Sequence, residues 1–398
     1  MSGPSVLAPA SEEELAGAVA EAARSGQPLA VEGNGTKRAM LRPVQAARTL
    51  STRNLTGITL YKPQELIISA RAGTPLPEIE AALAERGQHL IAEPPDLGAL
   101  FGAGGVPATL GGTVAANLSG PRRISGGAMR DHVMGIRAVT GTGEVFRSGG
   151  RVLKNVTGLD LAKLLTGSHG TLGVLTEITL KVLPASESSA TVAVRVPDLL
   201  AGVRALSAGL GSPFGVSGAA LLPDAGGGGG ALALLRIEEF AESVAYRAGR
   251  LRDDLSGLGE PRLIEDVESR DLWRRVRDAE ALGAEPDDAV WRVSVRPTAG
   301  PAVAAAVRAA GLSRLLLDWG GGLVWIAGLA TAEAHAAVAA AAGAQGGAFT
   351  LFRAPDSLRA AVAVLPEEPA PLAAVGRRVK AVLDPAGVLN PGRMRAGA

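Results

Sequence analysis

The chain has 398 residues, a formal net charge of +1 at pH 7 and only 3% aromatic residues. The nearly balanced charge argues against a nucleic-acid-binding surface, and the scarcity of aromatic rings argues against base stacking. There is no cysteine, which excludes disulfides, iron–sulfur clusters and thiol nucleophiles in this chain, so any electron transfer requires an organic cofactor.

The length predicts two or three domains, and the first half of the chain mixes helices with strands. Ser11 to Glu14 form a capping box that opens a helix with Leu15 and Val19 on its inner face. No signal peptide pattern is present, and no apolar run approaches the roughly 18 residues of a membrane-spanning helix. The further elements expected in this half are strands at 29–32 and 66–70, a helix at 75–86, a hairpin at 133–140 and 144–147, and a strand at 174–183.

A proline followed by small polar residues at 184–189 is typical of a domain junction. The five-glycine run at 226–230 predicts a surface loop, and the proline-rich stretch at 366–371 predicts a linker that leads to a basic helix at 372–383. The other elements expected are strands at 191–196, 215–222, 231–237, 291–295, 314–318, 323–327 and 348–353, separated by helices near 198–209, 240–256, 301–310 and 331–342.

Two glycine-containing loops carry the strongest functional signal. Thr109 to Asn117 places two glycines before small residues that can start a helix, and the loop at 33–37 follows a strand candidate. Backbone N–H groups in such loops can bind an anion without a Cβ in the way, and a helix start adds a favourable partial charge. Two loops of this kind in one domain predict a ligand with two phosphates.

The common nucleotide-binding templates do not match the first loop. A Rossmann fingerprint needs a glycine at its sixth position, and counting from Gly33 that position holds Arg38. A Walker A loop needs Gly-Lys followed by Ser or Thr, whereas Gly35 is followed by Thr36. The phosphate therefore belongs to a different kind of nucleotide site.

A series of short motifs follows along the chain. They are Gly33-Asn34-Gly35-Thr36, the stretch from Glu65 to Leu76, Glu93-Pro94-Pro95, Thr109 to Asn117, Arg130-Asp131-His132-Val133, Gly141-Thr142-Gly143-Glu144, 154–161, 167–177 and 384–393. In this order they resemble the vanillyl-alcohol oxidase/PCMH family of FAD-binding flavoproteins. Within that family, the loop at 33–37 and the runs at 118–123 and 389–394 are similar to the short FAD-binding subunits of bacterial glycolate oxidases (glycolate dehydrogenases).

The resemblance implies an α+β fold with three parts. These are a PCMH-type two-part FAD-binding domain at 1–184, a ferredoxin-like α+β cap domain at 190–360, and a C-terminal helix and tail at 371–398 that returns to the FAD domain. It also implies non-covalent FAD, because relatives attach the cofactor through a histidine beside the first loop or a cysteine, and this chain has neither.

The residues that the resemblance assigns to FAD binding come from both loops, the proline motif, the 167–177 segment and the tail. They are Gly33, Asn34, Gly35, Thr36, Lys37, Pro95, Thr109, Gly111, Gly112, Ala115, Ala116, Asn117, Gly173, Val174 and Asn390. Taken alone, the first loop also suits an ordinary tight turn, the glycine pair suits close helix packing, and Asn117 suits a buried amide as well as it suits a flavin contact.

The implied activity is oxidation of the CH–OH group of a small 2-hydroxy acid. In the glycolate oxidase complex, glycolate becomes glyoxylate, and the partners are a larger flavin subunit and an iron–sulfur subunit. A cytoplasmic location follows, or a peripheral one at the inner membrane through the partners. Two alternatives stay open: a structural or electron-relay subunit that binds FAD without a substrate site of its own, and a stand-alone dehydrogenase of another 2-hydroxy acid.

The sequence identifies no catalytic base. Oxidation of a 2-hydroxy acid needs a cation for the carboxylate and a base for the hydroxyl proton. Arginine suits the carboxylate because it binds both oxygens at once, and the candidates in the cap are Arg236, Arg292, Arg296 and Arg353. The four histidines, at 89, 132, 169 and 335, lack metal-ligand spacing, so no metal site is expected.

Overall fold

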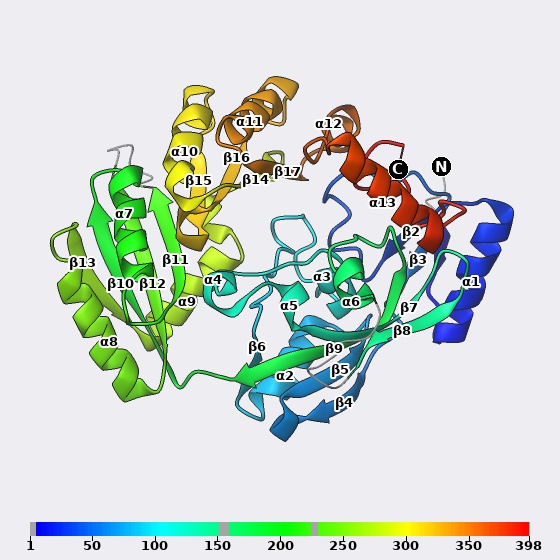
Figure 1. Ribbon diagram of the computed structural model, residues 1–398, viewed down its shortest axis with the longest axis horizontal. Helices are drawn as coiled ribbons and strands as arrows, with labels where there is room; N and C mark the ends of the chain where they lie inside the picture. The colour runs from blue at the N-terminus through cyan, green and yellow to red at the C-terminus, as the bar shows by residue number, and fades with distance from the viewer. Residues whose placement is uncertain (1–4, 151–158, 224–229, 398) are drawn as a thin grey trace. The chain divides into compact units, whose positions relative to one another are not determined.

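The computed structural model describes residues 5–150, 159–223 and 230–397, which form two compact units (Figure 1). The first unit combines the chain up to Leu118 with Gly127–Ala185 and the segment from Glu367 onward. The second combines Ser119–Gly126 with Ser186–Pro366. Most of the motif at 154–161 and of the glycine run at 226–230 lies outside the described residues. The domain ranges expected from sequence kept 119–126 with the FAD-binding domain, whereas this segment packs with the second unit.

Two sheets form the first unit. The smaller is parallel, in the order β1-β3-β2, and the larger runs antiparallel in the order β4-β5-β9-β7-β8, with β6 pairing to β9 (Figure 1). The expected hairpin is therefore confirmed as β7 and β8. The strands are β1 (Ser5–Leu7), β2 (Leu29–Glu32), β3 (Arg48–Ser51), β4 (Ile58–Lys62), β5 (Ile67–Arg71), β6 (Gln88–Leu90), β7 (Val133–Val139), β8 (Val145–Gly149) and β9 (Val174–Pro184).

The first helix begins at the predicted cap, Ser11, but the reciprocal bond of the capping box is shifted by one residue, to the amide of Ala10. The Ser11 hydroxyl accepts a hydrogen bond from the Glu14 amide at 3.1 Å, and the Glu14 carboxylate accepts one from the Ala10 amide at 2.8 Å. Leu15 and Val19 are fully buried against the parallel sheet. The helices of this unit are α1 (Glu12–Ser25), η1 (Pro63–Glu65), α2 (Leu76–Ala84), α3 (Leu110–Ala115), α5 (Met129–His132), α6 (Leu161–Leu165) and α13 (Ala370–Leu383).

The second unit is built on one antiparallel sheet of eight strands in the order β13-β10-β12-β11-β15-β16-β14-β17. Its strands are β10 (Ser188–Val196), β11 (Val216–Pro223), β12 (Ala231–Glu239), β13 (Glu260–Glu265), β14 (Ala289–Ser294), β15 (Arg314–Asp318), β16 (Leu323–Gly328) and β17 (Ala348–Arg353). Its helices are α4 (Arg123–Gly126), α7 (Leu199–Leu210), α8 (Ala241–Asp254), α9 (Asp266–Arg277), η2 (Glu280–Leu282), η3 (Pro297–Ala299), α10 (Gly300–Ala309), η4 (Trp319–Gly321), α11 (Ala332–Ala344) and α12 (Asp356–Ala361).

The eight-stranded sheet consists of two ferredoxin-like repeats in tandem. From β10 to β13 and again from β14 to β17 the chain runs strand, helix, strand, strand, helix, strand, and α9 lies between the two repeats in sequence. In each repeat the first and third strands are central, and the fourth lies outside the first. The two repeats join where Leu221 of β11 pairs with Leu317 of β15. The ferredoxin-like cap expected from sequence is confirmed, and it occurs twice.

The two faces of this sheet differ in their cover. Gly202 of α7 packs against Leu221, and α7 also contacts α10, which contacts α11, so these helices share one face. Trp273 of α9 lies against Gly218 and against the side chain of Arg236, which points to the other face. We call this second side the α9 face. Because alternate residues of a strand point to opposite sides, Glu238 also lies on the α9 face.

Candidate cofactor site

The two glycine loops lie side by side at the carboxyl end of β2. The side-chain amide of Asn34 donates to the carbonyl of Pro107 at 3.0 Å. A methyl group at Gly33 would lie 2.1 Å from Oγ1 of Thr109, and one at Gly112 would lie 3.8 Å from Nζ of Lys37. The structure thus brings together the two segments that the sequence proposed as opposite sides of one site.

The first loop presents unused backbone donors. In the part of the chain that the structure describes, the amides of residues 34–37 donate to no protein acceptor. Ser51 holds the loop from outside, because its hydroxyl donates to the carbonyl of Gly33 at 2.7 Å. Successive free amides in a turn form a concavity that suits an anion. This arrangement fits a pyrophosphate and supports the phosphate interpretation over the ordinary turn.

Helix α3 contributes small side chains rather than free amides. The Gly111 amide donates to the carbonyl of Ala72 at 2.7 Å, and the Gly112 amide donates to Oγ1 of Thr109 at 3.2 Å. A methyl group at Gly111 would collide with Ala72. Gly111 therefore serves close packing, which the sequence left open, and both amides are already engaged.

One side of α3 is partly exposed and carries only small residues. Gly112, Ala115 and Ala116 are spaced at i, i+3 and i+4, so they share this side. Asn117 lies at the end of the helix with φ of 48°, and its side-chain oxygen accepts from the Arg130 amide at 3.0 Å. A flat ligand can approach the backbone closely along this side.

Three basic side chains meet beside the first loop. Burial lowers the pKa of Lys37 to about 8, although the charge of Asp96 raises it. Asp96 follows the buried Pro95, so the proline motif lies next to the same lysine. Burial, aided by the charges of Arg393 and Lys37, lowers the pKa of His169 to about 3. At neutral pH the site therefore holds a neutral imidazole beside two cationic groups.

The C-terminal tail holds these elements in place. The side-chain oxygen of Asn390 accepts from the Val31 amide at 2.7 Å, and its nitrogen donates to the carbonyls of Val31 at 3.2 Å and His169 at 2.8 Å. Arg393 donates to the carbonyls of Lys37 and Arg42 at 2.6 and 3.1 Å. Both amide hydrogens of Asn390 are thus used by the protein, and the residue positions the loop instead of offering a donor to a cofactor.

Gly173 and Val174 belong to the packing around the site. A methyl group at Gly173 would lie 3.1 Å from the carbonyl of Val139 and 3.2 Å from a Leu165 methyl. Val174 pairs with Val139 and is buried in the core under the parallel sheet. Gly173 therefore allows close packing against Val139 and Leu165, and Val174 fills the core with its side chain.

Sequence reasoning missed the ion pair that anchors the tail. Lys380 donates to the Asp384 carboxylate at 2.6 Å and to the carbonyl of Thr171 at 2.7 Å. The Asp384 carboxylate also accepts from the amides of Val388 and Leu389. An i, i+4 Lys–Asp spacing at the end of the last helix was the available signal.

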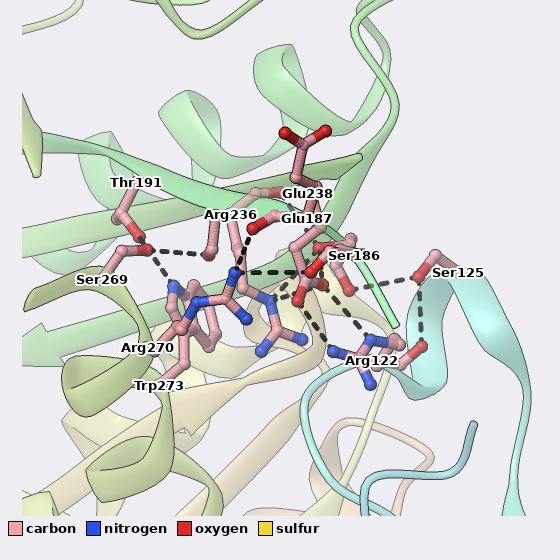
Figure 2. Close-up of polar contacts among 12 residues, drawn as sticks. Arg122, Ser125, Ser186, Glu187, Thr191, Arg236, Glu238, Ser269, Arg270 and Trp273 are labelled. Carbon is pink, nitrogen blue, oxygen red and sulfur yellow. Dashed lines mark hydrogen bonds and ion pairs between the residues drawn. The ribbon is translucent and has the colours of Figure 1, made fainter. Parts of the chain in front are cut away.

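The cap arginines differ in what they bind. Arg236 pairs with Glu238 at 3.1 Å on the α9 face, beside Trp273 (Figure 2). Arg353 donates to the backbone carbonyls of Glu285 and Asp288, and Arg296 is exposed. Arg292 is the exception, because its buried Nε has no hydrogen-bond partner.

Neither a metal cluster nor a membrane-spanning helix is found among the residues that the structure describes. Within those ranges, no three His, Asp or Glu side chains gather closely enough to hold a metal ion. Across the same ranges, every helix is too short or too polar to cross a bilayer.

Comparison with known proteins gives consistent matches. Residues 4–149 match a family model described as an FAD binding domain. The glycolate oxidase subunit GlcE of Escherichia coli K12 is 36% identical over 369 residues, which cover 93% of each chain. A D-lactate dehydrogenase of Archaeoglobus fulgidus is 30% identical over 195 residues, 49% of this chain and 42% of its own. A solved alkyldihydroxyacetonephosphate synthase superposes with a TM-score of 0.70 at 16% identity, covering 97% of this chain and 76% of its own.

Proposed function

Because the chain belongs to the family of the glycolate oxidase subunit GlcE, a family of FAD-dependent oxidoreductases, we propose that it is the FAD-binding subunit of a glycolate oxidase. Its substrate is glycolate, its product is glyoxylate, and the electrons leave to an iron–sulfur partner. The observation that carries the proposal is the cradle at residues 33–37, where consecutive free amides and Lys37 lie against the small residues of α3.

In this proposal the pyrophosphate lies against the first loop. Its charge is met by the amides of residues 34–37 and by Lys37, while Gly33 and Gly112 leave room for it. Ala115, Ala116 and Asn117 continue the contact along α3, and Thr109 holds the helix start. Pro95, Gly111, Gly173, Val174 and Asn390 shape the site by packing. The FAD-binding domain is 1–184 with the tail at 371–398, and the cap is 190–360.

When bound, FAD supplies the hydride acceptor for oxidation of the hydroxy acid. The protein's part is to bind, orient and keep charges in place. Lys37 and Arg393 give the site a positive potential, and His169 stays neutral beside them, so its imidazole can donate one hydrogen bond and accept another. The cofactor is held without a covalent bond, since the first loop has no histidine and the chain has no cysteine.

The partners in this proposal are a larger flavin subunit and an iron–sulfur subunit. The absence of cysteine supports an external cluster, because a chain without thiolates cannot ligate one in the usual way. The location is cytoplasmic, or peripheral at the inner membrane through those partners. A second arrangement, in which this chain binds FAD but a partner holds the substrate, is favoured by the lack of a metal-ligating cluster among the described residues.

Co-purification of the chain with its native partners tests the proposal. The complex, identified by mass spectrometry, is expected to reduce an artificial acceptor with glycolate, and the isolated chain is expected to be inactive or nearly so. Turnover of a different 2-hydroxy acid by the isolated chain would indicate a stand-alone dehydrogenase. A preparation without flavin and without partner subunits would refute the assignment.

A further inference from the structure

Arg292 occupies an unusual position in the second unit. It lies in β14, opposite Trp325 of β16 and Thr350 of β17. The preceding residue, Trp291, points to α11, where its indole nitrogen donates to Nδ1 of His335 at 3.2 Å. Since neighbouring residues of a strand point to opposite sides, Arg292 points to the α9 face.

Aromatic rings surround the guanidinium of Arg292. Its central carbon lies 4.7 Å from the centre of the Trp325 ring, 5.3 Å from Phe352 and 5.4 Å from Trp319. Trp325 and Phe352 meet edge to face with centres 5.2 Å apart. Rings of this kind stabilise a cation but do not neutralise it.

The guanidinium lacks the partner that a buried charge normally has. Nε is buried and bonds to nothing, and in the described residues the whole group makes no hydrogen bond. Burial lowers the pKa of Arg292 to about 10, with a further lowering by Arg123 and an opposing effect of Asp318. The group is therefore still cationic at neutral pH, and an unpaired buried donor is costly.

A second cation stands next to the first. The guanidinium carbon of Arg123 lies 4.4 Å from the centre of the Trp319 ring, whose other neighbour is Arg292. Two like charges on one ring repel each other unless an anion shares them. Asp318 is a carboxylate near this group, since its charge raises the pKa of Arg292, but it forms no hydrogen bond with the Arg292 Nε, which is left available for a second anion.

The segment that carries Arg123 is clamped to the sheet (Figure 2). Arg122 donates twice to the Glu238 carboxylate, at 3.2 and 2.8 Å, and Ser217 donates to the same carboxylate at 2.6 Å. Ser125 donates to the carbonyl of Ser217 at 3.1 Å. Arg122 therefore anchors the segment to the sheet, and this anchor fixes the position of the neighbouring Arg123.

Trp319 is held just as firmly. Its backbone takes a left-handed φ of 54°, which is strained for a bulky residue. Its amide donates to the Asp318 carboxylate at 2.7 Å, and its indole nitrogen donates to the carbonyl of Gly120 at 3.2 Å. Strain retained by surrounding bonds is common at binding sites.

From this geometry we propose that the second unit binds a small carboxylate at Arg292, with Arg123 as the second cation and Trp319 between them. The Nε edge of a guanidinium offers two parallel donors at the spacing of the two carboxylate oxygens. A small acid brings a carboxylate and little further polar surface that would have to lose its water among the rings. That the acid is a 2-hydroxy acid such as glycolate rests on the proposed function.

The other cap arginines do not offer this site. Arg236 and Arg353 spend their donors on Glu238 and on backbone carbonyls. Arg314 also has an unpartnered Nε, but it pairs with the Asp288 carboxylate at 2.5 Å. Arg296 lies exposed just beyond the same strand as Arg292, which makes it a matched control.

Titration of the purified full chain with sodium glycolate and sodium oxalate, at constant ionic strength, tests the site. Two of the four tryptophans, Trp319 and Trp325, border it, so intrinsic fluorescence should change saturably, with calorimetry as an independent readout. Arg292→Gln, and Arg123→Gln at the exposed second arginine, are each expected to weaken carboxylate binding by about 10-fold or more. Arg296→Gln is expected to leave the carboxylate affinity unchanged. Arg292→Lys, which keeps the charge but not the two-donor edge, should fall between them.

Three results would overturn the inference. They are the absence of any saturable response, equal binding of inorganic phosphate or sulfate, and unchanged carboxylate affinity in both Arg292→Gln and Arg123→Gln with thermal unfolding as in the parent. The titration is run with and without FAD. A chain that binds the carboxylate but not FAD would count against the proposed function alone. A chain that binds FAD but gives no carboxylate response would count against this site alone.

Discussion

Replacing Gly33 by alanine tests whether the two loops act as one binding site. The added methyl group would lie 2.1 Å from Oγ1 and 2.9 Å from Cγ2 of Thr109, and real Cβ contacts do not come closer than about 3.0 Å. The loop or α3 must therefore move, and overpacking of this kind costs about 1–3 kcal/mol. If all of that cost falls on the bound state, FAD affinity drops by roughly 5- to 150-fold.

The assay is quenching of FAD fluorescence on titration with apoprotein. Gly17→Ala is the control, since Gly17 has open space around it in α1 of the same unit. The double variant Gly33→Ala/Thr109→Ala removes the two closest contacts and should recover part of the affinity. Parental FAD affinity in Gly33→Ala, with unchanged unfolding, would show that the loops do not meet around the cofactor.

Three further predictions concern Lys37, Glu238 and Asn390. Because Lys37 loses its proton near pH 8 in the folded chain, FAD affinity should fall as the pH rises above about 8, and Lys37→Gln, measured by the same titration, should abolish that slope. Burial raises the pKa of Glu238, but Arg236 and Arg122 lower it to about 2 from 4.5. The stability this pair supplies is therefore present above pH 4.5 and lost as the pH falls toward 2, about 3 kcal/mol in urea unfolding, and Glu238→Gln should remove this pH dependence. Asn390→Ala should free the tail and lower stability by about 1–3 kcal/mol, seen as faster cleavage of the C-terminus by carboxypeptidase; an unchanged cleavage rate would contradict its anchoring role.

Local patterns were enough to predict much of the first unit. The Ser11 cap of the first helix and the hairpin of β7 and β8 depend on residues that are neighbours in sequence, and both are present. The glycine loops were also visible, because glycine is needed where a backbone must approach closely. What Gly111 does was not visible, since its contact is with Ala72, far away along the chain.

The repeat in the second unit escaped the sequence for a different reason. Strand β13, at Glu260–Glu265, alternates charged and apolar residues weakly and was not expected. Without it the first strand–helix–strand–strand–helix–strand series is incomplete, so its recurrence from β14 to β17 cannot be recognised. Strand order, which makes the two series alike, arises only on pairing.

The cap arginines show where sequence reasoning ends. Four of them looked equivalent, because each lies in or beside a strand. Their difference depends on which acceptors arrive from other segments: Glu238 for Arg236, backbone carbonyls for Arg353, and aromatic rings alone for Arg292. Such partners are set by the fold, and a single sequence does not reveal them.

The FAD content of the purified chain shows whether the two loops bind a flavin. Acid precipitation followed by chromatography and absorbance of the supernatant measures the flavin released per chain. We expect one FAD per chain, all of it released because no covalent bond holds it, and much less FAD in Gly33→Ala. A chain that carries no flavin and binds none when FAD is added, or one whose flavin stays with the precipitate, would contradict this expectation.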